Sequence, residues 1–160
     1  KNRKVSYDTL SNYLGYIEEA FLAYKTERYN IKGKDVVAGN CKYYLNDLSF
    51  KNFLYPGFAY GVGYLLENAV YLELRRLGYI VYTGSFRDKE VDFVAMKDDR
   101  VIYLQATYML ETAQTMEREY APLLTIGDNY EKYVVSMDEV QFPSNEGVRH
   151  IQAWNLKEIL

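Results

Sequence analysis

Polar side chains inside otherwise apolar segments are the feature that most constrains the fold of this chain. Glu67 lies in a run with helical spacing of apolar residues, Asp92 lies in a later strand-like run, and Gln105 and Thr107 lie in the strand-like run after that. Side chains in a strand alternate between its two faces, so Gln105 and Thr107 share a face. If the two strands pair as a hairpin, these polar positions converge, and Glu67 reaches the same point from the preceding helix.

From residue 58 onward, the periodicity predicts the order helix, three strands, helix, strand, which is a mixed α/β sandwich. Gly78 is expected to end the first of these helices, and Thr112 to cap the second. The helices are predicted over 61–77 and from 112 to about 126. The strands are predicted over 79–83, 90–96, 101–108 and 132–136, followed by a strand over 150–154 and a short helix over 156–160.

Alternation along the second predicted strand places Glu90 and Asp92 on one face, and Val91 and Phe93 on the other. The core is expected to contain the apolar residues of the strands and of the first long helix, namely Leu66, Val91, Phe93, Leu104 and Val134.

The first fifty residues are predicted to form a small separate unit. Ser6 is expected to cap a helix that runs to about Tyr24, with one apolar face. Two short strands are expected, within 22–29 and over 42–45. The turn residues at 55–57 mark a boundary, so the predicted domains are 1–50 and 51–160.

Charge is divided in a similar way. Residues 1–60 carry nine Lys or Arg and six Asp or Glu, a balance of +3, and residues 61–160 carry ten against sixteen, a balance of −6. The acidic part argues against broad binding of a phosphate backbone there, because that affinity comes from basic side chains. The basic part favours weak, salt-sensitive DNA binding.

The rare residue types exclude several kinds of site. The single cysteine, Cys41, excludes an intrachain disulfide and indicates a reducing compartment, which we expect to be the cytoplasm. With one histidine, His150, a zinc site built from Cys and His clusters is excluded. No run approaches eighteen apolar residues, so no membrane partner is expected. The chain begins without methionine, and we expect it to be a piece of a longer protein.

The converging polar residues fit the chemistry of phosphodiester hydrolysis. Carboxylates hold Mg²⁺, which stabilises the phosphate and activates water, so Asp92 and Glu67 are the predicted metal ligands. Gln105 offers a weaker, neutral carbonyl, and Thr107 lacks the positive charge that a nearby lysine would supply. Arg118, on the second long helix, is the candidate replacement cation. The structural alternative is that Glu67 only caps a hydrogen bond or faces solvent, and that Asp92 is a charge that protects an edge strand from unwanted pairing.

Short motifs that resemble one family are spread over most of the chain: Lys42–Leu48, Leu66–Val70, Gly78-Tyr79, Glu90–Val94, Tyr103–Gln105, Glu117–Glu119 and Asp128–Tyr133. In them the chain resembles an uncharacterised prokaryotic domain that lies C-terminal to AAA-type ATPase cores. Ser6–Leu10 with Tyr13-Leu14 resembles the winged-helix-like piece that links the ATPase to this domain.

That family is similar in fold to the PD-(D/E)XK nuclease superfamily. The resemblance implies a restriction-endonuclease-like mixed sheet flanked by helices, preceded by a small helical, winged-helix-like segment. It also implies that Glu67, Asp92 and Gln105 are counterparts of the superfamily's acidic residues. Thr107 stands where the superfamily has lysine, so the implied catalytic site is vestigial.

The leading hypothesis is therefore an accessory or regulatory domain of a AAA-type ATP-binding protein, acting as a binding module. Its partners would be its own upstream ATPase core, nucleic acid or another protein. ATP is expected to bind only in the upstream region, because Gly61-Val62-Gly63 and Gly33-Lys34 do not form a phosphate loop. The alternatives are an active Mg²⁺-dependent nuclease with a rearranged site, and a protein-interaction module with a tyrosine-rich surface.

Overall fold

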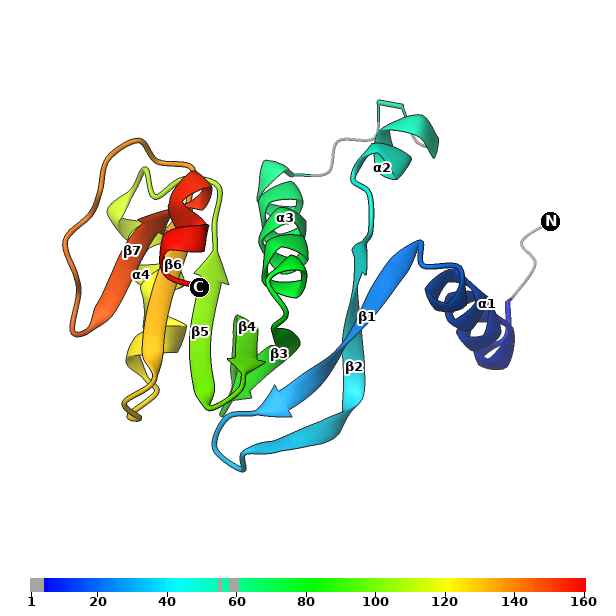
Figure 1. The fold of residues 1–160 in the computed structure, drawn as a ribbon, viewed down its shortest axis with the longest axis horizontal. Helices are drawn as coiled ribbons and strands as arrows, with labels where there is room; N and C mark the ends of the chain where they lie inside the picture. The colour runs from blue at the N-terminus through cyan, green and yellow to red at the C-terminus, as the bar shows by residue number, and fades with distance from the viewer. Residues whose placement is uncertain (1–4, 55, 58–60) are drawn as a thin grey trace.

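A computed structural model of the chain describes residues 5–54, 56–57 and 61–160. Seven strands form one mixed sheet in the order β2-β1-β3-β4-β5-β6-β7 (Figure 1). The strands are β1 (Ala23–Asn30), β2 (Asp35–Leu45), β3 (Ile80–Phe86), β4 (Lys89–Lys97), β5 (Arg100–Ala106), β6 (Glu131–Ser136) and β7 (Val148–Gln152). The helices are α1 (Tyr7–Glu19), α2 (Ser49–Leu54), α3 (Val62–Arg76), α4 (Ala113–Leu124) and the 3-10 helix η1 (Ala153–Glu158).

The two long helices α3 and α4 pack on opposite faces of the sheet. Leu66 of α3 packs with Phe93 and Leu104 in one buried cluster, and residues of α4 pack with Val91 and Val134 in the other. All five of these predicted core residues are buried, and the predicted mixed sheet flanked by helices is confirmed. None of the helices in the described ranges is long and apolar enough to cross a bilayer.

The predicted helix ends are set by local chemistry. The side chains of Ser6 and Thr112 each accept a backbone N–H three residues further on, at 3.1 Å. Gly78, just after α3, has a φ of +86°, a left-handed conformation that glycine adopts without strain. The first helix ends at Glu19, earlier than the predicted Tyr24, because the chain turns there and enters β1 at the buried Ala23.

The N-terminal hairpin belongs to the main sheet. β1 pairs antiparallel with β2, as the predicted strands suggested, and pairs in parallel with β3 through residues 28–30 and 83–85. The sheet therefore runs across the predicted boundary at 55–57, of which Tyr55 lies outside the described residues. α1 lies beside β1 (Figure 1) and contains no buried residue, and its predicted apolar face is only partly covered, with Leu14 and Ile17 half-buried and Leu10 and Tyr13 exposed.

An irregularity in β4 reverses the predicted side-chain alternation. The register pairs residues 82–84 of β3 with residues 91–94 of β4, so β4 contains one extra residue. This β-bulge lies at Asp92 and Phe93. Val91 packs in the cluster on the α4 side, while Phe93 packs on the α3 side. The prediction that Val91 and Phe93 share a face is therefore wrong, because the extra residue shifts the pleat by one position.

Candidate functional site

The ammonium group of Lys42 lies among three carboxylates. Its Nζ is 2.9 Å from Glu67 Oε1, 2.9 Å from Glu90 Oε1 and 3.6 Å from Asp92 Oδ1. These residues come from β2, α3 and β4, and we call them the Lys42 cluster. The side chains of Glu67 and Asp92 are only 13% and 12% exposed, so the attraction between these charges is poorly screened by water.

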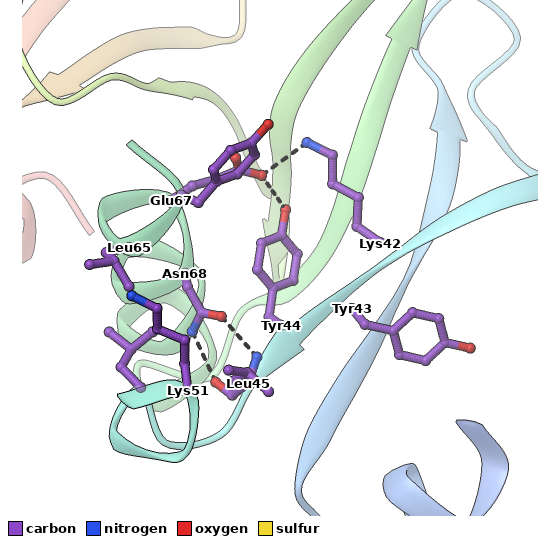
Figure 2. A pocket seen from close by; sticks show the side chains of 10 residues that line it. Lys42, Tyr43, Tyr44, Leu45, Lys51, Leu65, Glu67 and Asn68 are labelled. Atoms are coloured by element: carbon purple, nitrogen blue, oxygen red, sulfur yellow. Dashed lines mark hydrogen bonds and ion pairs between the residues drawn. The ribbon is translucent and has the colours of Figure 1, made fainter. Parts of the chain in front are cut away.

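A buried tyrosine orients the Glu67 carboxylate. The hydroxyl of Tyr44 donates a 2.7 Å hydrogen bond to the same Glu67 oxygen that contacts Lys42 (Figure 2). The Tyr44 ring stacks on Tyr71 of α3, with ring centroids 4.2 Å apart. Burial and the nearby Glu67 charge raise the pKa of Tyr44 well above its usual range, so its hydroxyl remains a donor. Glu67 is thus held by two donors from β2.

Asp92 lies where β4 and β5 separate. Their backbone pairing ends at Phe93, and the Asp92 carboxylate then accepts the backbone N–H of Ala106 at 2.9 Å. The backbone N–H of Asp92 donates to Gln105 Oε1 at 3.3 Å. The Gln105 side chain therefore joins the two strands beyond the point where their backbone pairing ends. The bulge therefore turns Asp92 toward both the next strand and the Lys42 ammonium.

Burial determines the protonation of Asp92. It raises the pKa of this carboxyl to about 7, and the negative charge of Glu67 adds to the effect. Lys42 and the Ala106 N–H act in the opposite direction, but they do not outweigh burial. The pKa of Lys42 is raised in turn, because the attraction of Asp92 and Glu67 exceeds the effect of its own burial.

A second cation completes the cluster at its exposed side. Arg28 of β1 donates to Glu90 at 2.7 Å. Three carboxylates then face two cations, so the group carries a net charge of −1 when all members are ionised. A proton on Asp92 brings this sum to zero, so the charge balance adds to the effect of burial on the pKa of Asp92.

The other predicted site residues have different surroundings. Thr107 is buried, and its backbone N–H donates to the carbonyl of Val135 on β6. Arg118 pairs with its neighbour Glu119 at 2.6 Å, and its side chain is 70% exposed. The cation in contact with Asp92 and Glu67 is Lys42, which the sequence reasoning missed as a site residue. The available signal was Lys42 itself, a charged residue in an apolar strand within one of the family-like motifs.

The arrangement does not fit the predicted magnesium site. Within the described ranges, no group of three or more His, Cys, Asp or Glu side chains is placed to hold a metal ion. The predicted ligands Asp92 and Glu67 share the ammonium of Lys42, and Glu67 also accepts from Tyr44. A divalent cation would need to displace Lys42 before it reached these oxygens.

A cavity of about 580 Å³ opens beside the cluster, between β2, α2 and α3 (Figure 2). Its wall includes Tyr64, Leu65 and Glu67 of α3. Asn68, also in this wall, accepts the Leu45 N–H at 2.8 Å and donates to the Leu45 carbonyl at 2.9 Å. This side-chain amide therefore pairs with the edge of β2 as a neighbouring strand would, and it fixes the hairpin to α3.

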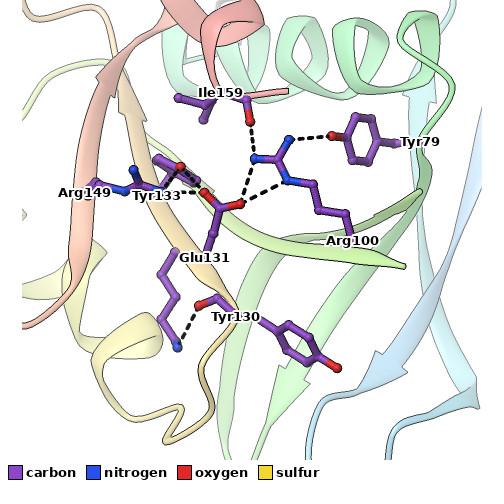
Figure 3. Close-up of polar contacts among 8 residues, drawn as sticks. Tyr79, Arg100, Tyr130, Glu131, Tyr133, Arg149 and Ile159 are labelled. Carbon is purple, nitrogen blue, oxygen red and sulfur yellow. Dashed lines mark hydrogen bonds and ion pairs between the residues drawn. The ribbon is translucent and has the colours of Figure 1, made fainter. Parts of the chain in front are cut away.

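A separate polar network closes the other end of the sheet (Figure 3). Glu131 of β6 accepts from Arg100 at 2.8 Å and from Tyr133 at 2.6 Å, and it pairs with Arg149 of β7. Arg100 also donates to the carbonyl of Ile159 at 2.6 Å. The hydrogen bond from Tyr133, and then those from the two arginines, lower the pKa of Glu131. This network joins β5, β6, β7 and the C-terminal segment, and its members bond to one another.

The proteins to which this chain is similar include two that are described as uncharacterised. One, from Haemophilus influenzae, is 37% identical over 128 residues, which cover 80% of this chain and 31% of the relative. The other, from Methanocaldococcus jannaschii, is 32% identical over 122 residues, which cover 74% of this chain and 26% of the relative. No protein-family profile matches the chain, and no solved structure matches it significantly. The chain spans about a third or less of the length of the relatives it matches.

Proposed function

We propose that this chain is a binding module with a restriction-endonuclease-like fold, in which a lysine occupies the place of the catalytic metal. The observation that carries the proposal is the position of Lys42, whose ammonium contacts Glu67, Glu90 and Asp92. The order of Glu67 on a helix, Asp92 at a strand bulge and Gln105 on the next strand supports the proposed nuclease-like fold.

An ammonium group serves as a counterion for the carboxylates but not as a Lewis acid. Metal-assisted hydrolysis depends on a cation that polarises the phosphoryl oxygen and lowers the pKa of a bound water. Lys42 supplies charge without open coordination positions. The cluster carries no net positive charge whether or not Asp92 is protonated, so it does not attract a phosphodiester, and a protein surface is the partner that we propose for this site.

We further propose that the module belongs to a AAA-type ATP-binding protein and lies C-terminal to its ATPase core. The support is the set of family-like motifs, together with the fact that the chain spans only part of its relatives. The test is the sequence of the longer protein and its ATPase rate with and without residues 5–160. A longer protein without a phosphate loop would refute this assignment.

The nuclease reading is tested directly by cleavage assays. The purified chain is incubated with single-stranded and duplex DNA and with RNA, in Mg²⁺ or Mn²⁺, beside Asp92→Ala. We expect no cleavage by the unmodified chain above the background given by Asp92→Ala. Cleavage that Asp92→Ala abolishes would overturn the proposal.

Metal binding provides an independent test of the role of Lys42. We expect Lys42→Met to bind Mn²⁺, as measured by calorimetry and electron paramagnetic resonance, because Glu67 and Asp92 then lose the ammonium that a divalent cation would have to displace. The unmodified chain and the control Lys25→Met, which removes an exposed lysine of β1, should bind none at the same concentration. Equal affinity in all three proteins would show that Lys42 does not exclude the metal.

One observation favours a second candidate function, a nuclease with a relocated lysine. Lys42 Nζ lies 3.6 Å from Asp92, and it supplies the positive charge that Thr107 lacks. Under this alternative, Lys42→Met abolishes a measurable cleavage activity. Under the binding-module proposal, there is no activity for the substitution to remove.

A further inference from the structure

The only histidine of the chain is buried between β6, β7 and the loop that joins them. His150 lies in β7, with Nε2 2.8 Å from Ser136 Oγ and Nδ1 3.2 Å from the backbone nitrogen of Phe142. Phe142 belongs to the connecting loop 137–147 and also places its ring edge-on to the imidazole, with centroids 5.0 Å apart. Both ring nitrogens therefore have a neighbour.

The hydrogen bonds around His150 determine which of its ring nitrogens carries a proton. The Ser136 hydroxyl donates its one hydrogen to Asp138 Oδ2 at 2.6 Å. The hydrogen between Ser136 and His150 must then come from the imidazole Nε2. Nδ1 accepts the N–H of Phe142, so it carries a lone pair. His150 is therefore neutral, with its proton on Nε2.

The loop that His150 holds covers the outer edge of the sheet. β7 is the last strand in the sheet order, and Asn145 exchanges two backbone hydrogen bonds with Val148, at 3.0 and 2.9 Å. Gln141 donates its side-chain amide to the carbonyl of His150. Loop 137–147 thus bonds to the N–H and C=O of Val148 and to the C=O of His150, on the outer edge of β7.

We propose that His150 is a proton-controlled latch that holds loop 137–147 against β7 while the imidazole is neutral and releases the loop when Nδ1 is protonated. Protonation places an N–H of the ring against the N–H of Phe142, so the acceptor of this hydrogen bond is lost and two donors face each other. The consequence is local, because the backbone pairing of β5 with β6 does not involve the ring.

The surrounding charges set the direction of the response. Burial lowers the pKa of His150, and the carboxylate of Asp138 in the loop opposes this effect without reversing it. From α4, Tyr120 packs in the buried cluster on this side, and burial and Asp138 raise its pKa, so it stays uncharged. Arg149, adjacent in β7, pairs with Glu131. Because the folded pKa is lowered, the latch is closed above about pH 6.5 and opens as the pH falls below the folded value.

Amide hydrogen exchange on the whole chain tests this latch. Rates are corrected for intrinsic exchange and compared at about pH 7.5 and about pH 5, which bracket the ordinary pKa of histidine. We expect protection of the Phe142 amide to fall at least about tenfold at the lower pH while β5 amides keep theirs. Protection of Phe142 that does not change, or that falls together with β5, would overturn the proposal.

Two further measurements test the role of His150, and the first uses the unmodified chain, so it does not depend on how well a variant folds. The ¹⁵N shifts of the His150 ring should report the Nε2–H form at neutral pH, and the opposite tautomer would refute the assignment. In His150→Gln, which does not titrate, loop protection should be equal at the two pH values. A loop that still opens in acid in His150→Gln would show that another group controls it.

Discussion

Lys42 and Glu67 lie 25 residues apart in the chain and are joined by a 2.9 Å ion pair that links the N-terminal hairpin to α3. The hairpin also pairs with β3 through a short parallel ladder, and its Leu45 backbone is bonded to the side chain of Asn68 on α3. The same ion pair holds together the candidate site, so the stability of the fold and the state of the site are linked.

Removing the central cation should destabilise the protein. In Lys42→Met, Glu67 and Asp92 lose their counterion while Glu90 keeps Arg28, and we expect a loss of about 2 kcal/mol in the free energy of unfolding. This figure is set below the cost of breaking a fully buried pair because Lys42 is 31% exposed. Urea unfolding measures it, with Lys25→Met as the control. An equal loss in both variants would contradict a special role for Lys42.

Asp92 should make the stability depend on pH. Its folded pKa is raised to about 7 from 3.8, so the folded state binds a proton more tightly than the unfolded state. Its contribution to stability is therefore complete below about pH 4 and is lost as the pH rises through about 7. We expect Asp92→Asn to gain roughly 2 kcal/mol relative to the unmodified chain between about pH 5 and about pH 8. A difference between the two proteins that is constant with pH would show that Asp92 does not titrate in this way.

Asn68 should hold the end of β2. Asn68→Ala leaves the N–H and the C=O of Leu45 without their partner, and we expect a loss of about 1–2 kcal/mol. Amide exchange at Leu45 should accelerate in the variant, because this N–H becomes unpaired. Asn52→Ala, which changes an exposed residue of α2, is the matched control and should leave Leu45 protected.

The bulge in β4 depends on a glycine in the neighbouring strand. A Cβ at Gly84 would lie 2.8 Å from Val94 and 3.0 Å from Ile31 and Val91, so Gly84→Ala should cost about 1–3 kcal/mol by overpacking. At Gly15, in the exposed helix α1, a Cβ meets nothing within 4 Å among the described residues. Gly15→Ala should therefore be neutral or stabilising by up to about 1 kcal/mol. Thermal unfolding of both variants compares them, and similar effects at the two positions would refute the packing argument.

Much of the fold was predictable from local patterns. The helix caps at Ser6 and Thr112 act within one turn, and the core positions of Leu66 and Phe93 follow from apolar periodicity. Periodicity does not reveal an extra residue in a strand, so the alternation around Asp92 was misjudged. The bulge arises from the pairing of β4 with β3 and from the space beside Gly84, and both are tertiary effects.

The candidate site was predictable only in part. Asp92 and Gln105 are adjacent through a backbone hydrogen bond, and Glu67 reaches Asp92 through Lys42, as convergence of the polar positions suggested. The cation could not be placed, because Lys42 arrives from a strand far from the other members in sequence. Arg118 is predicted from its charge and its place on the second long helix, but its exposed position on α4 leaves it paired with Glu119.

The parallel pairing of β1 with β3 has a consequence for any attempt to isolate the second part of the chain. A chain shortened to residues 51–160 would turn β3 into an unprotected outer strand and would uncover the rings of Tyr71 and Phe93, on which Tyr44 packs. Exposed strand edges next to uncovered aromatic surface promote self-association. We therefore expect such a fragment to aggregate under conditions where the whole chain stays monodisperse, and light scattering would measure the difference. The N-terminal hairpin would then prevent polymerisation by covering the edge of β3.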